Sequence, residues 1–476
     1  MPIKSAKNKN IYFIGIKGVG MTMLAQFLAG EGDKISGSDI ADSFLTDKVL
    51  RASKIKVFSP FSAENVPIGS DLIVYSSAYN ENNNPELAFI KDHPNLFKKT
   101  KILPYAAALG AIFNRHYGVA VCGSHGKTTT SAWLGYVLWR SGLKPKVLVG
   151  SRVPQFKGSS LNGASQYFIA ETDEYQNKLR YFQPRGVILN NIDYDHPDFY
   201  KTKTSYAKAF SDFVKKIPAA GFLIVNNRDR ESRRIKKYCR GQVISYDLVT
   251  GSYGSGADYL AYDLRLEKGW QIFKLSYKDQ DLGEFKISLW GEHNVLNALA
   301  VIAAARQQAV PLIALKKHLA GFKGTERRAQ VLGRYAGALI IDDYAHHPTE
   351  IKATVYGLRQ RYPANRIITV FHPHTFTRTK ALFQDFVRSF ANTDELIILD
   401  IYGSAREKKG GVSSRGLAAA IDKANRQRGV KQSVRHIPTI AAASAYLRRR
   451  LAPADILLLM GAGDVFRIGA ELLRKK

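Results

Sequence analysis

The residues from Gly123 to Thr129, GSHGKTT, have the side chains and the spacing of a phosphate-binding loop. In such a loop, glycines between a strand and a helix leave backbone N–H groups free to face phosphate oxygens, and the helix dipole favours anions. Lys127 supplies a mobile positive charge, and the hydroxyl of Thr128 suits Mg²⁺. The loop is shorter than G-x-x-x-x-G-K-[ST], because Val121 stands where the first glycine would be. The pattern predicts nucleotide phosphate chemistry; the plainer alternative is a glycine-rich turn.

Two acidic segments follow candidate strands further along the chain. Glu171-Thr-Asp173-Glu174 follows one apolar run, and NNIDYDH, residues 190–196, follows another. Carboxylates at one strand end and an imidazole at the next can hold Mg²⁺ between substrate phosphates. Either segment alone could be a solvated acidic loop. Downstream of a phosphate loop, the two together predict a metal–nucleotide site.

The elements that must position these residues alternate between strands and helices, which predicts parallel sheets covered by helices. With 476 residues the chain is too long for one core. Residues 258–289 instead alternate as antiparallel hairpins, and Gln155–Ser165 is a loop by composition. The expected helices are Met21–Ala29, Thr128–Ser141 and His293–Gln307. The expected strands are Ile11–Ile16, Lys34–Ser38, Leu72–Tyr75, Gly118–Cys122, Tyr167–Ala170, Val187–Leu189, Ala338–Ile341, Arg366–Phe371, Glu395–Ile401 and Ile456–Met460.

Composition narrows the class of protein. Two cysteines give no disulfide framework and fit a reducing cytoplasm, the first residues do not form a signal peptide, and no apolar run is long enough for a membrane span. Lys and Arg total 70 against 40 acidic residues, a net charge of +30. Because the positive charges are scattered along the chain, the excess favours either a basic composition common to the whole proteome or anionic substrates over specific nucleic-acid binding. A basic, nucleic-acid-dependent ATPase remains the alternative from another class.

The motifs GSHGKTTT, ETDE, NNIDYDH, GEHNVLNALA and DDYAHHPTE, in this order, resemble the Mur ligase family of ATP-dependent amide-forming enzymes of peptidoglycan synthesis and cell-wall biogenesis. The resemblance runs from Ile11 to Phe466, and the shortened loop is this family's own version. It implies a three-domain α/β protein of the cytoplasm, either a monomer or a homodimer. The implied domains are a Rossmann-like domain for the UDP substrate (1–112), a central P-loop-type ATP-binding domain (113–324) and a Rossmann-like domain for the amino acid (325–476).

Several motifs are most similar to the family members that join L-alanine to UDP-N-acetylmuramate, among them GIKGVGM, SGSD, FHPHTFTRT and GAGD. The reaction so implied phosphorylates the muramic carboxylate, and the amine then attacks the acyl phosphate through a tetrahedral intermediate. Two features leave the acceptor open: YQN at 175–177 and LNN at 189–191 look closer to the members that ligate murein tripeptide. Lys17 stands where the family usually has glycine, so the first loop departs from the G-x-G-x-x-G pattern.

The resemblance also implies a role for each matching residue, with ATP as co-substrate and Mg²⁺ as cofactor. Catalysis is assigned to Lys127, Glu171, His196 and Arg327, and the metal to Thr128, Glu171 and His196. ATP is assigned to Gly123, Ser124, His125, Gly126, Lys127, Thr128, Thr129, His293, Asn294, Asn297, Arg327, Arg328 and Asp343. The UDP substrate is assigned to Gly15, Gly18, Gly20, Asp39, Ser76 and Ser77, and the acceptor to His346, His347, His374 and Arg378. Each of three assignments has a simpler structural alternative. Asp39 could end a strand, the pair His346-His347 could begin a helix, and Arg378 could be a surface arginine.

Overall fold

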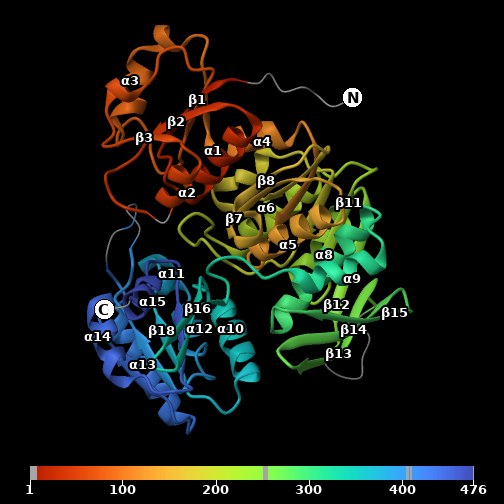
Figure 1. Ribbon diagram of the computed structural model, residues 1–476, viewed down its shortest axis with the longest axis vertical. Coiled ribbons are helices and arrows are strands. Elements are labelled where there is room, and N and C mark those ends of the chain that lie inside the picture. Colours follow the sequence, from red (N-terminus) through yellow and green to blue (C-terminus); the bar gives the residue numbers. More distant parts are fainter. Residues whose placement is uncertain (1–7, 45, 250–255, 404–406, 408–409, 475–476) are drawn as a thin grey trace.

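The three strand–helix segments expected from the sequence each fold around a β-sheet of their own, as the computed structural model shows for residues 8–44, 46–249, 256–403, 407 and 410–474 (Figure 1). We call them the first lobe (residues 10–113), the middle lobe (117–321) and the third lobe (330–473). The expected three-domain α/β fold is confirmed. No helix among the described residues is long and apolar enough to cross a membrane.

The first lobe has five parallel strands in the order β3-β2-β1-β4-β5. The central strand β1 is buried from its second residue onward, which is why it reads as a continuous apolar run and not as an alternating one. The strands are β1 (Asn10–Ile14), β2 (Lys34–Ser38), β3 (Lys56–Phe58), β4 (Leu72–Tyr75) and β5 (Lys101–Pro104). The α-helices are α1 (Val19–Glu31), α2 (Asp47–Ala52), α3 (Pro85–Asp92) and α4 (Tyr105–Phe113).

The middle lobe has ten strands in the order β15-β14-β13-β12-β11-β10-β6-β9-β7-β8. Strand β6 lies between β10 and β9 and is parallel to both, so the phosphate loop that follows β6 emerges at the carboxyl edge beside the ends of its neighbours. Ligands of open α/β sheets bind at such an edge. The strands are β6 (Tyr117–Cys122), β7 (Lys146–Val153), β8 (Gly158–Asn162), β9 (Tyr167–Glu171), β10 (Gly186–Leu189), β11 (Phe222–Asn226), β12 (Gln242–Leu248), β13 (Tyr259–Glu267), β14 (Trp270–Tyr277) and β15 (Gln280–Ile287). The last three form the expected antiparallel hairpins.

Helices α5 and α8 pack against the middle sheet and bury most of their residues. In α5, the indole of Trp133 is fully buried and stacks on the ring of Phe322, with centroids 5.2 Å apart. This packing fixes the helix whose first turn carries the phosphate loop. The α-helices of the lobe are α5 (Lys127–Arg140), α6 (Lys203–Val214), α7 (Arg230–Ile235), α8 (Glu292–Gln307) and α9 (Leu312–Gly321).

The prediction of a loop over Gln155–Ser165 is wrong, since this segment contains strand β8. The strand pairs antiparallel with β7 and rests on α1 of the first lobe. There the amide of Asn162 donates a hydrogen bond to the carbonyl of Phe27 at 2.8 Å. Composition failed here because glycine, serine and asparagine have low strand propensity, and the pairing partner and the supporting helix are distant in sequence.

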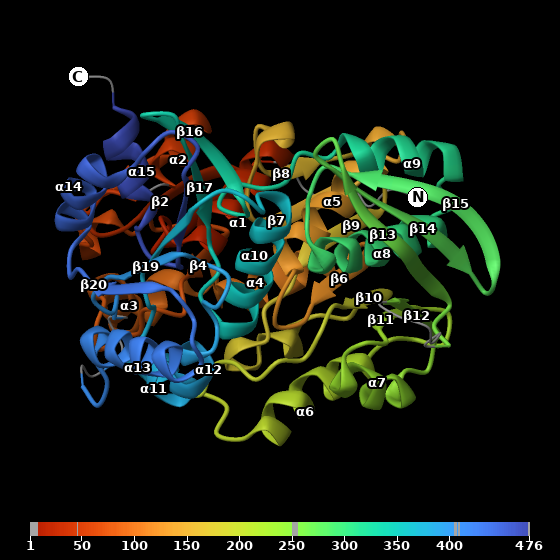
Figure 2. The same ribbon diagram turned by 90° about the horizontal axis from the view of Figure 1, so that it is seen from below.

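The third lobe has six strands in the order β16-β17-β21-β18-β19-β20, parallel except for β16. Helix α10 lies on the side that faces the middle lobe, as both views show (Figures 1 and 2). The strands are β16 (Gln330–Tyr335), β17 (Ala338–Asp343), β18 (Ile367–Phe371), β19 (Glu395–Ile398), β20 (Ser433–His436) and β21 (Ile456–Met460). The helices are α10 (Pro348–Arg361), α11 (Phe376–Ala381), α12 (Phe383–Val387), α13 (Ser414–Gln427), α14 (Ile440–Arg450) and α15 (Phe466–Leu473).

Candidate active site

The phosphate loop needs glycine at two positions. Gly126 caps the start of α5 with φ +81°, and Gly123 has φ +121°, both in a region that side chains disfavour. A Cβ on Gly126 would also lie 2.5 Å from Oδ1 of Asn297, and one on Gly123 would lie 2.8 Å from the carbonyl oxygen of Asn191. The loop is therefore pressed against α8 on one side and against the segment after β10 on the other.

Two asparagines after β10 hold the loop in place. Oδ1 of Asn191 accepts a hydrogen bond from the backbone N–H of His125 at 2.9 Å, and its carbonyl accepts one from the N–H of Ser124 at 3.0 Å. The amide of Asn190 donates to the carbonyl of His125 and to the hydroxyl of Thr130. These residues looked like the tripeptide-ligating branch in sequence, but in the structure they support the phosphate loop.

Lys127 folds back over its own loop. Its ammonium donates hydrogen bonds to the carbonyls of Gly123 (2.6 Å) and Ser124 (3.0 Å) and lies 3.5 Å from Oε2 of Glu174. Burial lowers the pKa of Lys127, but the surrounding carboxylates, led by that of Glu174, outweigh burial and raise the pKa. The lysine is thus a permanent positive charge at the mouth of the phosphate loop.

The structure divides the expected metal trio between two neighbouring groups. Glu171 accepts a hydrogen bond from the hydroxyl of Thr128 at 2.9 Å and another from the N–H of Gly150 at 2.6 Å. His196 lies instead with Asp173 and Glu174, and the three ligand atoms are within 4.8 Å of one another.

The donor set of both groups fits Mg²⁺. Oε2 of the buried Glu174 accepts no hydrogen bond from any described residue and faces the ammonium of Lys127 at 3.5 Å, so its lone pairs remain available to a metal ion beside that ammonium. Hard carboxylate oxygens and a threonine hydroxyl are the ligands that Mg²⁺ prefers. Of the residues in the second group, Asp173 and Glu174 had no assigned role in the sequence.

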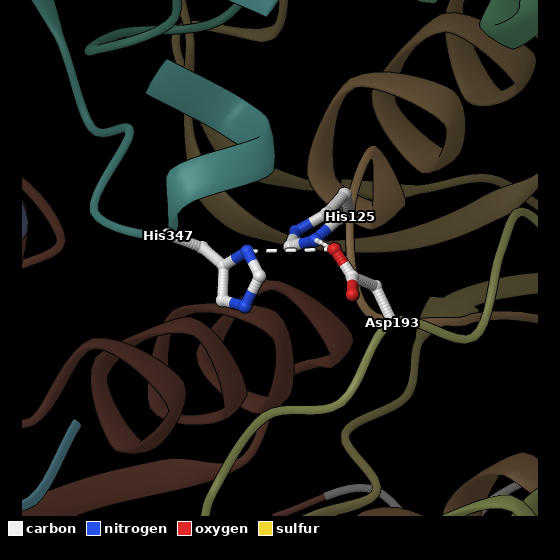
Figure 3. Close-up of side chains that lie close together, drawn as sticks. All are labelled: His125, Asp193 and His347. Atoms are coloured by element: carbon white, nitrogen blue, oxygen red, sulfur yellow. Dashed lines mark hydrogen bonds and ion pairs between the residues drawn. The ribbon is translucent and has the colours of Figure 1, made fainter. Parts of the chain in front are cut away.

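A second cluster ties the phosphate loop to the third lobe (Figure 3). Nε2 of His125 lies 3.0 Å from Oδ2 of Asp193, and Nδ1 of His347, at the start of α10, lies 3.4 Å from the same oxygen. On its other side, Nδ1 of His125 lies 3.2 Å from Oε1 of Glu350. Nε2 of His347 faces the carbonyl of Tyr194 at 3.3 Å.

The charges in this cluster follow from its contacts. Burial lowers the pKa of His125, but the hydrogen bonds to Asp193 and Glu350 outweigh burial and raise the pKa to about 9. Burial raises the pKa of Asp193, but the hydrogen bond from His125 and the neighbouring histidines lower the pKa to about 2. His125 is therefore an imidazolium between two carboxylates, one from each lobe. The three ligand atoms of His125, Asp193 and His347 have a metal-like spacing, but their ion pairs and hydrogen bonds already account for it.

The expected acceptor residues lie at the same interface. Arg378 is only 6% exposed, which excludes a surface role, and its Nε and Nη2 donate to Asp195 at 2.9 and 3.2 Å. Its Nη1 lies 3.2 Å from Nδ1 of His374, whose ring in turn lies 6.2 Å from that of His346. Burial lowers the pKa of His374 to about 4 and that of His346 to about 3, so both imidazoles are neutral. The fourth expected residue, His347, is buried and caps α10.

A cavity of about 790 Å³ opens between the middle and third lobes. Most of the expected ATP residues line it, together with the apolar side chains of Leu289, Trp290 and Leu296. Burial raises the pKa of Asp343 to about 6, although the N–H groups of Ala329 and Ala345 donate to its carboxylate. The expected residues on the lining are His125, Gly126, Thr129, His293, Asn294, Asn297, Arg328 and Asp343.

Arg327 is not on this lining. Its guanidinium donates to Asp342 at 3.1 Å and to the carbonyl of Gly461 at 2.7 Å, and it lies over the ring of Tyr344. Arg328 lines the cavity instead, 3.6 Å from Glu350. The guanidinium of Arg327 is thus directed toward Asp342 and Gly461 of the third lobe, and not toward the expected nucleotide residues on the cavity lining.

The expected UDP-substrate residues lie at the carboxyl ends of three adjacent parallel strands of the first lobe. Gly15, Asp39 and Ser76 follow β1, β2 and β4, respectively. Asp39 does more than end a strand, since its carboxylate accepts from the N–H groups of Lys17 (2.6 Å) and Ile40 (2.8 Å). The other residues of the set are Gly18, which caps α1, Gly20, which faces the ring of Tyr105, and Ser77.

Five acidic residues of the site had no individual role in the sequence, although their motifs were identified. Asp193 and Asp195 are in NNIDYDH, Asp173 and Glu174 are in ETDE, and Glu350 closes DDYAHHPTE. Only their acidity was visible, and acidic side chains are common on solvated loops. Their partners come from other lobes or other strand ends, so no local pattern identifies them.

Known proteins resemble this chain along nearly its whole length. Residues 10–117 match the profile described as "Mur ligase family, catalytic domain", residues 121–305 match "Mur ligase middle domain", and residues 327–463 match "Mur ligase, glutamate ligase domain". The chain is 38% identical over 466 residues to a UDP-N-acetylmuramate–L-alanine ligase of Desulfitobacterium hafniense, covering 98% of this chain and 99% of that protein.

Two solved structures resemble the whole molecule. A UDP-N-acetylmuramate–alanine ligase from Thermotoga maritima superposes with a TM-score of 0.81 at 22% identity, covering 98% of both chains. A murein peptide ligase from Psychrobacter arcticus gives a TM-score of 0.71 at 22% identity, also over 98% of both chains. At this level of identity, the two structures establish the shared fold.

Proposed function

The chain belongs to the Mur ligase family, and from this premise we propose that it joins the carboxyl group of UDP-N-acetylmuramate to the amino group of L-alanine. ATP supplies the energy, and ADP and phosphate leave. The product is a precursor of peptidoglycan, made in the cytoplasm. The proposal includes the division into domains at 1–112, 113–324 and 325–476, which one sheet in each segment supports.

The main observation behind the proposal is that the phosphate loop and the segment after β10 contact the third lobe. His125 of the loop contacts Glu350 of α10, and Asp195, beyond the next strand, contacts Arg378 of α11. A ligase that first activates a carboxylate and then admits an amine needs these two ends of the reaction side by side. The nucleotide cavity opens at the same interface.

The residue types suit the first half-reaction. A carboxylate is a poor electrophile, and transfer of the terminal phosphoryl group of ATP onto it creates a leaving group. Lys127 and Arg328 place fixed positive charge where negative charge spreads over the transferring phosphoryl group. Thr128, Glu171, His196, Asp173 and Glu174 would hold Mg²⁺, which supplies further charge neutralisation when bound.

The second half-reaction needs an anchor for a small amino acid. L-alanine offers little apolar surface, so an arginine that binds its carboxylate is the strongest handle available. Arg378 is such an arginine, and the neutral imidazoles of His346 and His374 leave it the main positive charge at this end. The tripeptide-like asparagines hydrogen-bond to the phosphate loop, whereas Arg378 contacts Asp195 and His374, which favours alanine over murein tripeptide as the acceptor.

Phosphate release in the presence of ATP, Mg²⁺ and UDP-N-acetylmuramate tests the proposal with a panel of acceptors. We expect the highest kcat/KM for L-alanine, and values lower by about 10- to 200-fold for glycine, because one methyl group discriminates only weakly. L-serine should also be poorer. The Lys127→Met variant, purified in parallel, controls for contaminating ATPases. A higher kcat/KM for murein tripeptide than for L-alanine would overturn the acceptor assignment.

A further inference from the structure

The ion pair between Asp195 and Arg378 crosses from the middle lobe to the third lobe. Asp195 follows β10, and Arg378 lies in α11, 183 positions further along the chain. Oδ1 of Asp195 accepts from Nε at 2.9 Å and Oδ2 accepts from Nη2 at 3.2 Å, a two-pronged contact along one side of the guanidinium. Both side chains are under a tenth exposed. Such a bidentate pair fixes orientation as well as distance.

The contact leaves part of the guanidinium uncovered. A guanidinium carries five N–H groups in one plane. Asp195 takes the edge formed by Nε and Nη2, and Nη1 turns toward the ring and the carbonyl of His374. The second N–H group of Nη2 meets no acceptor among the described residues, and the two contacts of Nη1 to His374 are long, at 3.2 and 3.4 Å, so a second carboxylate can take the edge between Nη1 and Nη2 in place of one of them.

We propose that Asp195 is a positioning residue for the acceptor: it holds Arg378 from one side across the lobe interface so that the other edge of the guanidinium can bind the carboxylate of the incoming amino acid. This inference rests on the proposed function and adds a residue to it. Because Asp195 precedes His196, one segment of the middle lobe contacts both the acceptor anchor and the metal-binding carboxylates.

A purely structural ion pair would behave differently. Its loss would weaken the closed arrangement of the two lobes, and the KM values of ATP, UDP-N-acetylmuramate and alanine would change together. A positioning role affects one substrate, because only the acceptor uses Arg378. The distinguishing measurement is therefore the KM of each substrate and not the activity alone.

The test uses Asp195→Asn, which keeps the shape of the side chain and removes its charge. We expect the KM for L-alanine to rise by about tenfold or more, as is typical for the loss of a charged hydrogen bond, while the other two KM values stay within about twofold. Asp195→Glu keeps the charge and should recover part of the affinity. The matched control is Asp212→Asn on the exposed face of α6, where the carboxylate pairs, among the described residues, with Lys208 and Lys215.

A double-mutant cycle with Arg378→Ala asks whether Asp195 acts through Arg378. If it does, Asp195→Asn adds little to the alanine KM once Arg378 is gone. Should Asp195→Asn not fold, the expected alanine-specific rise is read from Asp195→Glu, in which the carboxylate is displaced.

Three results would overturn the inference: an unchanged alanine KM, a parallel rise in all three KM values, or full additivity in the cycle. If the wild-type protein prefers murein tripeptide to alanine, the proposed function fails, and this role of Asp195 fails with it. A wild-type protein that uses alanine beside an unaffected Asp195→Asn variant refutes the inference alone.

Discussion

Replacing Lys127 with methionine tests the phosphate loop most directly, because the change removes the ammonium and keeps the length of the side chain. The structure predicts two separate losses. Turnover should fall by about 100-fold or more, since a fixed charge on the transferring phosphoryl group is lost. The middle lobe should also lose stability, because Glu174 is 1% exposed and its Oε2 lies 3.5 Å from the ammonium.

The size of the second loss follows from the distance. At 3.5 Å and an effective dielectric constant of about 20, the attraction between the two charges is about 5 kcal/mol. Breaking a buried pair by removing one partner typically costs about 3–5 kcal/mol, because the other charge stays buried. We expect the free energy of unfolding of the middle lobe to fall by about 3 kcal/mol. The variant should still fold, but it should bind ATP poorly.

Both losses can be measured on the same samples. All four tryptophans of the chain, Trp133, Trp139, Trp270 and Trp290, lie in the middle lobe, and Trp290 also packs against the core of the third lobe, so urea unfolding followed by tryptophan fluorescence reports mainly on the middle lobe. Glu174→Gln alone should lower turnover, because Glu174 would help to hold Mg²⁺, so this background serves the stability measurement: in it, Lys127→Met should cost little stability. Turnover within a few-fold of wild type, or an equal stability loss in the Glu174→Gln background, would refute this account of the loop.

Three further predictions concern the metal, pH and nucleic acid. Glu171→Gln and His196→Ala should each raise the Mg²⁺ concentration needed for half-maximal phosphate release; unchanged titrations in both would leave them as structural polar residues. The pKa of His125 is about 9 in the folded protein and about 6.5 when unfolded, so its ion pairs stabilise fully below about pH 6.5 and are lost as the pH rises through about 9. Thermal unfolding should show this decline of about 3 kcal/mol in the wild type but not in His125→Gln, and equal declines would contradict the assignment. The net charge of +30 should give only weak nucleic-acid binding that added salt abolishes, as filter binding can measure; a sequence-selective complex stable at physiological salt would revive the nucleic-acid-dependent ATPase.

The local parts of the protein follow from short patterns in its amino-acid sequence. A buried strand, two glycines and a helix start fixed the phosphate loop, because backbone dihedral angles and hydrophobic periodicity act over a few neighbouring residues. Strands β2, β4 and β21 begin and end where the apolar pattern predicts. The order of the motifs also determined the family, since it preserves the sequence of sites along three domains.

Which charged side chains contact one another depends on the packing of the sheets and lobes. Glu171 pairs with Thr128 and not with His196, and Arg327 is held by Asp342 while Arg328 faces the cavity. Residues 158–162 form β8 because they pair with β7 and pack against α1.

For the same reason, the ion-pair partner of Arg378 could not be predicted from the sequence. A lone arginine in FHPHTFTRT can face solvent, a substrate or another lobe, and all three satisfy its local preferences. The lobes pack so that Asp195, 183 positions away, fills one edge of its guanidinium. A contact across such a separation depends on how whole sheets are placed, and no pattern of neighbouring residues encodes that placement.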